Sequence, residues 1–461
     1  MAILAAFMVP HPPLIIPTVG RGREAQIAET IRAYETVAAE IAALEPETIV
    51  ITSPHALMYA DYFSISSGKG ASGSFADFGA RGTSFQETYD TELVDEICLL
   101  ADACDFPAGT LGDRKKELDH GTMVPLWFIR NIYGKGKIVR MGLSGLPLAD
   151  HYQMGMLVRD AAERLQRKVV FVASGDLSHK LQEYGPYGFA EEGPAYDARI
   201  MDVCSRAAFG ELFDFDETFC EKAAECGHRS FTIMAGALDG FDVKARVYVH
   251  QDVTGVGYGI CSFYPGMEDA ERHFLAQYLK KEQEKTKQRQ EKSDAFVSLA
   301  RQSVEYYVKT GRYLPLPAGL PAEMTEKQAG AFVSLHEHGR LRGCIGTIAP
   351  TEDSLAEEIL RNAVSAASRD PRFSPVREEE LPYLEISVDV LGEPEYIDSP
   401  EELDVRRYGV IVSSGRKRGL LLPDLDGVDS VEQQIDIARQ KGGILPGEKI
   451  RLQRFEVIRH T

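Results

Sequence analysis

The stretch VPHPPL (residues 9–14) most constrains how this chain can fold. It follows the apolar run Ile3–Val9, whose composition suits a buried strand. Proline fixes φ and carries no N–H group, so neither a helix nor a sheet can continue through this stretch. His11 therefore stands on a stiff backbone just beyond the carboxyl end of a strand, the edge at which α/β folds place their chemistry.

Apolar runs that suit buried strands recur through the first half of the chain and alternate with helical periods. Residues 49–52, 137–142 and 168–173 are three such runs. Residues 27–44 carry apolar side chains at helical spacing and stop before Pro46. Strands that alternate with helices predict an α/β fold, with an N-terminal, largely parallel sheet flanked by helices.

Three of the apolar runs end in a short turn that carries a histidine: His11, His55 and His179. A fourth histidine, His120, lies in the segment DHGTMVPL. The carboxyl ends of neighbouring parallel strands converge at one edge of a sheet. A single histidine is more often a core or surface residue, but its repetition at three strand ends favours a shared site.

Length, charge and cysteine content narrow the class of protein. A chain of 461 residues exceeds one ordinary core and predicts two or three domains. The formal net charge of −19 argues against a nucleic-acid or membrane-binding surface. The seven cysteines form no CxxC pair, and the first apolar run lacks the basic flank of a signal peptide. We therefore expect a cytoplasmic protein with free thiols.

A change of composition near residue 267 predicts the domain boundary. Residues 267–293 are charged and rich in glutamine, and they indicate a solvated helical linker. We therefore expect an N-terminal domain over residues 1–266 and a separate, smaller α+β domain over residues 294–461. The second domain has its own apolar runs, at residues 331–335, 384–391, 410–412 and 419–422.

Two neutral imidazoles and one anionic side chain can form the three-ligand site of non-haem Fe(II) oxygenases, which leaves open positions for substrate and dioxygen. The anionic candidates are Glu225 and Cys226, and His228 is a further candidate ligand. Asp176 either orients the His179 imidazole or serves as a turn residue, because aspartate after Ser-Gly is common in turns.

Four motifs in order, HPPL, SPH, DHGTMVPLWF and SGDLSH, resemble the LigB-type class III extradiol dioxygenases and the related Memo proteins over about residues 1–265. The resemblance implies that His11 and His55 are two iron ligands. It also implies that His179 is the base that deprotonates a catecholic substrate, and that His120 contacts the substrate or handles a proton.

The resemblance leaves two choices for the third ligand. Ring-cleaving members carry a glutamate in this region, whereas Memo-like members carry a cysteine before a glycine. Glu225-Cys226-Gly227 offers both, and the match through CGHRSFTIMAGAL favours Cys226. A thiolate is softer than a carboxylate and shifts the metal preference toward copper, zinc or thiolate-bound iron.

The first functional expectation is an Fe(II)-dependent extradiol-type dioxygenase that uses dioxygen and a small aromatic substrate of the catechol kind. In such an enzyme Tyr184, Tyr187 and Phe189 would either line an aromatic pocket or pack in the core or in a loop. The alternative is a metal-binding component, without dioxygenase activity, of a modification system associated with a radical SAM protein.

The string GRLRGCIGTI (residues 339–348) is the most distinctive of the second domain. Its glycines permit a positive φ or a close backbone approach, so Arg342 and Cys344 mark either a ligand site or a tight turn into a buried strand. Together with SRDPRFSPV, EISVDVLGEPE and GLLLPDL, the string resembles the AMMECR-type domain. Memo-like and AMMECR-like proteins are associated with a radical SAM protein, so the resemblance implies a separate partner of that kind. We also expect a homo-oligomer.

Overall fold

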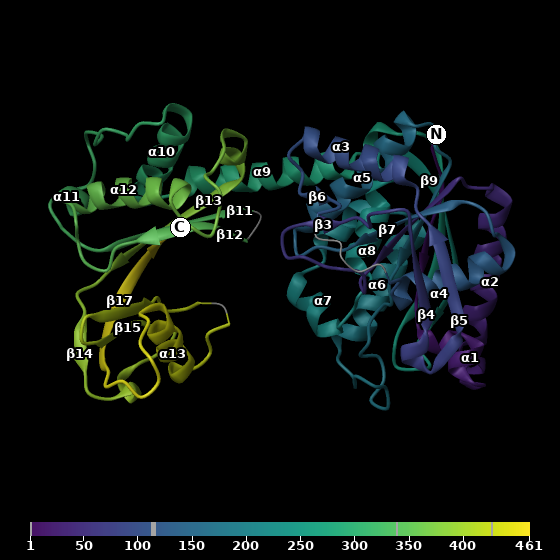
Figure 1. Cartoon of the computed structure of the whole chain (residues 1–461). Coiled ribbons are helices and arrows are strands. Elements are labelled where there is room, and N and C mark those ends of the chain that lie inside the picture. The colour runs from purple at the N-terminus through teal and green to yellow at the C-terminus, as the bar shows by residue number, and fades with distance from the viewer. Residues whose placement is uncertain (1, 112–116, 338–339, 426) are drawn as a thin grey trace. The chain divides into compact units, whose positions relative to one another are not determined.

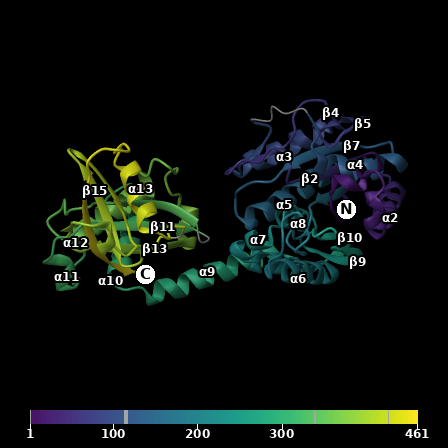
Figure 2. The ribbon, with the colours of Figure 1, turned by 90° about the horizontal axis from the view of Figure 1, so that it is seen from below.

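The computed structural model describes residues 2–111, 117–337, 340–425 and 427–461, and only the backbone of Arg340. Contacts divide the chain into two compact units, residues 1–279 and 280–461 (Figure 1). The division falls within α9 (Phe274–Lys292), which runs as one continuous helix (Figure 2). Within the described ranges, no helix combines the length and the apolar character needed to cross a membrane.

A six-stranded sheet forms the middle of the N-terminal unit, in the order β7-β2-β8-β1-β10-β9. The first four strands are parallel. At one edge, β10 pairs antiparallel with β1, and β9 pairs antiparallel with β10. The predicted largely parallel sheet is therefore confirmed. Its strands are β7 (Lys137–Gly142), β2 (Thr48–Ser53), β8 (Val169–Ser174), β1 (Ile3–Val9), β10 (Tyr258–Glu268) and β9 (Phe241–Gln251).

Helices cover both faces of this sheet because its parallel strands are apolar on both sides. In β1, Ala6 and Met8 belong to one core, and Phe7 and Val9 belong to the other. The first core is completed by α3 (Thr91–Ala103), α5 (Leu148–Arg164), α6 (Glu192–Arg206) and α8 (His228–Gly236). The second core is completed by α2 (Ala28–Leu44) and α4 (His120–Ile132).

Smaller elements complete the N-terminal unit. The short helices are α1 (Pro17–Gly20) and α7 (Glu217–Ala223). Two short strand pairs lie outside the main sheet: β3 (Phe63–Ser64) with β6 (Ala108–Gly109), and β4 (Gly70–Phe75) with β5 (Ala80–Thr88).

Helix α2 confirms the helix expected over residues 27–44. Its buried side chains recur at helical spacing along one side, including Tyr34, Val37 and Ile41. The helix ends where Glu45 adopts a left-handed conformation with φ of 46°, directly before Pro46.

The parallel register brings the ends of three strands to one edge of the sheet. Val9 of β1 lies beside Ser174 of β8, and Thr52 of β2 lies beside Ala173 of β8. The three strands therefore stop within a residue of one another, and the turns that follow them lie side by side.

An antiparallel sheet organises the C-terminal unit, in the order β12-β11-β13-β17-β15-β16, with β14 paired to β17. Helices α10 and α12 pack on the part of it formed by β11, β12 and β13, and α13 packs on β15 and β16 (Figure 1). The strands are β11 (Ala331–Glu337), β12 (Arg340–Gly346), β13 (Leu384–Leu391), β14 (Glu395–Ile397), β15 (Tyr408–Ser414), β16 (Lys417–Leu421) and β17 (Arg451–His460). The helices are α10 (Ala295–Thr310), α11 (Ala322–Thr325), α12 (Leu355–Ser368) and α13 (Val431–Lys441).

The string GRLRGCIGTI forms a strand, which one interpretation of the sequence expected to follow a tight turn. Its first residue, Gly339, lies outside the described residues, and most of the remainder forms β12 itself. Gly343 and Gly346 have no positive φ. They allow close packing instead, since a Cβ on Gly343 would lie 2.3 Å from the carbonyl oxygen of Ala366 in α12.

Candidate metal centre

Three side chains that are far apart in the sequence meet at the carboxyl edge of the N-terminal sheet: His11, His55 and Cys226. Their ligand atoms all lie within 4.8 Å of one another. Nε2 of His11 is 3.0 Å from Nε2 of His55 and 3.7 Å from Sγ of Cys226. His11 is buried, whereas His55 keeps contact with solvent. The cluster can therefore be reached from outside.

The spacing of these donor atoms fits a tetrahedral metal ion. Bonds of about 2.0 Å to nitrogen and about 2.3 Å to sulfur place two nitrogens about 3.3 Å apart and a nitrogen and a sulfur about 3.5 Å apart. The structure has 3.0 Å and 3.7 Å for these two distances. Imidazole and thiolate suit zinc, copper and iron. The residues present therefore fit a mononuclear transition metal.

A hydrogen-bond chain sets which nitrogen of His11 faces the cluster. The Ser174 hydroxyl donates its proton to the carbonyl oxygen of Gly121, at 2.6 Å. Because it has no second proton, Ser174 Oγ accepts from Nδ1–H of His11, 3.0 Å away. Nε2 of His11 therefore carries the lone pair. Burial, followed by the charge of His55, lowers the pKa of His11 to about 3 and keeps its ring neutral.

Hydrogen bonds also hold the backbone around His11. Oδ1 of Asp176 accepts from the N–H of His11 at 2.7 Å, and the Tyr34 hydroxyl donates to the carbonyl oxygen of Pro10. Neither role expected for Asp176 describes this bond, which joins it to the main chain of His11, 165 residues away in the sequence. The Asp176 carboxylate therefore holds the main chain of His11 in place.

Two glycines allow the turn that carries Cys226 to reach this edge. A Cβ on Gly175 would lie 2.2 Å from Cα of Gly227, and a Cβ on Gly227 would lie 2.3 Å from the ring of Phe231. This close approach puts Cys226 against the turn after β8, where its Sγ accepts from the N–H of Asp176 at 3.3 Å. Burial raises the pKa of the Cys226 thiol, so a bound metal has to displace a proton.

Glu225 and His228 point away from the cluster. Oε2 of Glu225 accepts from the N–H of His228 at 2.6 Å, at the first turn of α8, where helix N–H groups lack partners within the helix. Nε2 of His228 lies 3.0 Å from the carbonyl oxygen of Leu212. Burial raises the pKa of Glu225 to about 6 and lowers that of His228 to about 4. Both side chains serve the packing of α8.

His120 and His179 flank the three ligands. The ring centroid of His120 is 4.0 Å from that of His55, and burial lowers the pKa of His120 to about 4. Nδ1 of His179 lies 2.5 Å from the carbonyl oxygen of Ala224. A carbonyl only accepts, so Nδ1 carries the proton and Nε2 of His179 is free to accept one.

Aromatic side chains stand around this edge of the sheet. Tyr184, Tyr187 and Phe189 are 73%, 60% and 50% exposed, so they do not pack in the core. The ring of Tyr187 lies edge-on to His179, with centroids 5.1 Å apart, and Phe78 lies edge-on to His120 at 5.3 Å. These rings offer a flat ligand apolar contacts beside both histidines.

Sequence reasoning missed the residues that tie the ligand-bearing turns together. Asp119 caps α4 by accepting from the N–H of Thr122 at 3.0 Å, and it also accepts from the Ser53 hydroxyl at 2.5 Å. It thereby joins the end of β2, which carries His55, to the helix that begins with His120. The sequence alone can indicate that an aspartate begins a helix, but it does not reveal that the same carboxylate also binds Ser53.

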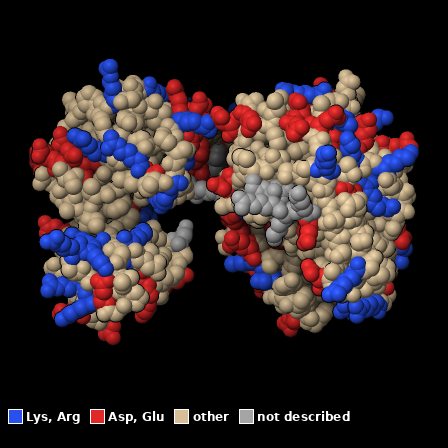
Figure 3. Space-filling model, in the orientation of Figure 1, with Lys and Arg blue, Asp and Glu red and all other residues tan. Residues whose placement is uncertain are grey.

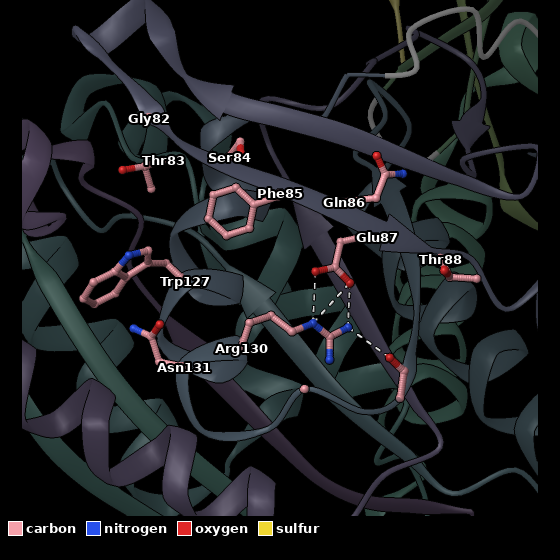
Figure 4. Close-up of a pocket in the computed structure, with 12 residues that line it drawn as sticks. Gly82, Thr83, Ser84, Phe85, Gln86, Glu87, Thr88, Trp127, Arg130 and Asn131 are labelled. Atoms are coloured by element: carbon pink, nitrogen blue, oxygen red, sulfur yellow. Dashed lines mark hydrogen bonds and ion pairs between the residues drawn. The ribbon is translucent and has the colours of Figure 1, made fainter.

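A separate hollow of about 560 Å³ lies between β5 and α4 (Figure 4). Arg130 donates there to both carboxylate oxygens of Glu87, at 3.0 and 2.6 Å. It also donates to the carbonyl oxygens of Lys135 and Gly136. Because the Arg130 guanidinium already donates to these groups of the protein, we assign the hollow a structural role.

The two candidate residues of the C-terminal unit have different surroundings. Nε of Arg342 donates to Oε1 of Glu380 at 2.6 Å, and its Nη1 donates to the carbonyl oxygen of Ser374 at 2.9 Å. Arg342 therefore braces a loop. Cys344 is half-buried and lies in the wall of a cavity.

Comparison with known proteins identifies both units. The family model described as the catalytic LigB subunit of aromatic ring-opening dioxygenase matches residues 5–261. The AMMECR1 family model matches residues 297–460.

Similar proteins come from bacteria and archaea. Protein CA_C1420 of Clostridium acetobutylicum is 40% identical, over 100% of this chain and 99% of its own length. A protein of Thermotoga maritima is 46% identical, over 36% of this chain and 96% of its own. The crystal structure of the uncharacterized protein JW3007 from Escherichia coli K12 matches with a TM-score of 0.40 and 16% identity, over 56% of this chain and 99% of that one. With both family models in order and a relative that matches end to end, this chain belongs to the LigB family over its N-terminal unit and to the AMMECR1 family over its C-terminal unit.

Proposed function

We propose that the N-terminal unit holds one transition metal ion, iron, zinc or copper, through His11, His55 and Cys226. In this proposal the chain is a metal-binding component of a modification system whose other member is a separate radical SAM protein. The observation that supports it is the position of Cys226, whose Sγ lies 3.7 Å from Nε2 of His11, while the neighbouring Glu225 carboxylate bonds to α8. The Memo-like proteins that this chain resembles carry a cysteine at this place.

A metal in this site supplies Lewis acidity and, if it is iron or copper, one-electron chemistry. The surrounding residues then define what a ligand meets. His179 accepts a proton at Nε2, because its Nδ1 is committed to the carbonyl oxygen of Ala224. Tyr187 and Phe78 provide apolar contacts for a flat molecule next to His179 and His120.

An extradiol-type dioxygenase acting on a catecholic substrate is the second candidate. The orientation of His179 favours it, since a free Nε2 is what a base needs in order to deprotonate a diol. His120, whose lowered pKa keeps it neutral, is available next to His55 to donate or accept a hydrogen bond.

Metal content tests the first proposal. The purified chain is loaded anaerobically with Fe(II), Zn(II) or Cu(I), desalted, and analysed for metal by mass spectrometry. We expect the wild type and Glu225→Gln to retain one ion per chain and Cys226→Ala to lose it. Glu225→Gln is the matched control, because it changes a buried neighbour of the same turn. Retention by Cys226→Ala together with loss in Glu225→Gln would contradict the proposal.

Oxygen uptake then separates the two candidates. The Fe(II)-loaded chain is assayed with catechol, protocatechuate and 2-aminophenol, with His179→Ala as the control. The metal-binding role predicts no uptake above that of His179→Ala, whereas the dioxygenase predicts uptake that depends on His179.

A further inference from the structure

The C-terminal unit contains a cavity of about 1740 Å³ that has no part in the proposed function. Its floor is one face of the strands β12, β11, β13 and β17. The other face of β11 and β13 is apolar and packs against α10 and α12. Because side chains alternate along a strand, the intervening residues point into the cavity.

The strand register arranges polar side chains in rows across this floor. Cys344 lies opposite Ser334, and Ser334 lies opposite Ser387. The Ser334 hydroxyl donates to Sγ of Cys344 at 3.2 Å. In the next row, Asp389 lies opposite Arg459 and forms an ion pair with it at 2.8 Å. A polar sheet face usually meets open solvent, but here it lies under walls from other elements.

Charged groups in the walls are largely paired with one another. Arg372 forms an ion pair with Asp370 at 2.7 Å, and Oδ2 of Asp370 also accepts from the N–H of Cys344 at 2.9 Å. Arg289 forms an ion pair with Glu385. These pairs leave no net charge of their own at the cavity surface.

Lys441, the last residue of α13, differs from these groups. It forms no hydrogen bond or ion pair with other residues in the described part of the chain. Cys344 and Arg372 line the same cavity. Lys441 is an exposed residue, and partial desolvation of its amine lowers its pKa. Among the described residues, the ammonium group of Lys441 therefore has no anionic partner; Lys292 and the carboxylate of Asp424 also line the cavity without a partner.

Apolar side chains form the opposite wall. Leu420 lies in β16, Leu422 directly after it, and Ile437 in α13, and Leu425 and Val428 lie in the loop between these elements. Figure 3 shows the C-terminal unit hollowed between its upper and lower parts, with Lys and Arg side chains gathered along the hollow. A monoanion with an apolar body matches both the positive charge of Lys441 and the apolar wall.

We propose that this cavity binds a small organic carboxylate, with its anionic group at Lys441 and its apolar body against β16 and α13. Cys344 and Ser334 lie beneath the carboxylate as hydrogen-bonding groups. A few convergent polar groups in a mainly apolar hollow are the usual composition of a small-molecule site. The cavity exceeds the usual ~300–1,000 Å³ of such sites, so the ligand fills the polar end and leaves an entrance.

Alkylation of Cys344 tests this proposal on the full chain. Iodoacetate is a small carboxylate and iodoacetamide is its neutral counterpart; both alkylate the thiol with loss of iodide, while buffer takes up the proton. Rates at each cysteine are read by peptide mass spectrometry. We expect the ratio of the iodoacetate rate to the iodoacetamide rate at Cys344 to fall several-fold in Lys441→Gln. Lys449→Gln, an exposed lysine outside the cavity, is the matched control and leaves the ratio unchanged. The ratio at the exposed Cys104, in the other unit, stays constant in all variants.

Competition identifies the anion. Phenylacetate, which has a carboxylate and an apolar body, slows the reaction of Cys344 with iodoacetamide in the wild type and in Lys449→Gln, but not in Lys441→Gln. Inorganic phosphate, which has no apolar body, does not. An unchanged rate ratio in Lys441→Gln, no protection by phenylacetate, protection by phosphate alone, or a Cys344 that reacts with neither reagent would each overturn the proposal.

Discussion

Replacing Ser174 by alanine tests the hydrogen-bond chain that orients His11. In the wild type, Ser174 Oγ lies 3.0 Å from Nδ1 of His11 and donates to the carbonyl oxygen of Gly121 at 2.6 Å. The substitution removes the acceptor of Nδ1–H from a site where His11 is only 2% exposed. The ring must then leave a buried donor unpaired, or move its proton to Nε2, the nitrogen that faces His55 and Cys226.

Both outcomes weaken metal binding. Loss of the partner that orients a metal-ligating histidine costs about 10–100-fold in affinity, which corresponds to ~1.4–2.7 kcal/mol. The metal-free chain also loses ~1–3 kcal/mol of folding free energy, because a buried polar group stays unsatisfied.

A metal titration against a competing chromophoric chelator, under anaerobic conditions, measures the affinity. Stability of the metal-free N-terminal unit is followed by the fluorescence of Trp127, the one tryptophan of the chain, during urea unfolding. Ser262→Ala is the matched control. Ser262 is buried in β10 of the same sheet and bonds to the Tyr248 hydroxyl at 2.9 Å, so its loss lowers stability without touching a ligand.

Two results would refute the reasoning about Ser174. One is a metal affinity of Ser174→Ala within about twofold of the wild type, below the range expected for a lost orienting partner. The other is an equal loss of affinity in Ser262→Ala, which would mean that lowered stability, and not the orientation of His11, weakens binding.

Three further predictions concern other parts of the structure. Glu225→Ala removes an acceptor at the first turn of α8, so urea unfolding should show a loss of ~1–2 kcal/mol while metal affinity stays unchanged; a parallel loss of metal would make Glu225 a ligand. Gly175→Ala introduces a Cβ 2.2 Å from the backbone of Gly227, so it should lower stability by ~1–3 kcal/mol and also weaken metal binding. Gly82→Ala, whose Cβ would have no neighbour within 4 Å, should change neither quantity. Hydrogen bonds from Arg372 hold the pKa of Asp370 in the folded chain below its usual value. The ionised carboxylate therefore stabilises the fold at any pH above the unfolded-state pKa of about 3.9. This stabilisation is lost as the pH falls toward the lower pKa of the folded state. Asp370→Asn should therefore destabilise the C-terminal unit at neutral pH, with a difference from wild type that shrinks below about pH 4 in urea unfolding followed by circular dichroism; a constant difference would contradict it.

Local patterns in the sequence were enough for much of the fold. The apolar runs at residues 49–52, 168–173 and 384–391 are strands β2, β8 and β13, and the helical period of residues 27–44 is α2. Strands of this kind are apolar on the sides they bury, and helices show apolar residues at their own spacing, so each type of element leaves its mark within one segment.

Other elements depend on contacts that no single segment contains. Strand β9 (Phe241–Gln251) carries polar residues at many positions and is held by its pairing with β10, and α12 packs closely on the glycine of β12 (Arg340–Gly346) at position 343. Neither partner is visible from the segment itself, so pattern alone missed the first strand and left open whether the second segment was a ligand site or a turn into a strand.

The candidate site divides in the same way. The sequence by itself determined that His11, His55 and His179 follow strands, and parallel strands bring their carboxyl ends to one edge whatever the rest of the chain does. It could not choose between Glu225 and Cys226, because adjacent side chains point in different directions only once their backbone is in place. The tertiary structure gives the two side chains different directions: Glu225 bonds to the first turn of α8, and the contact between Gly175 and Gly227 brings Cys226 beside His11. The proton on His11 is likewise assigned by Ser174, which lies 163 residues away in the chain and 3.0 Å away in the fold.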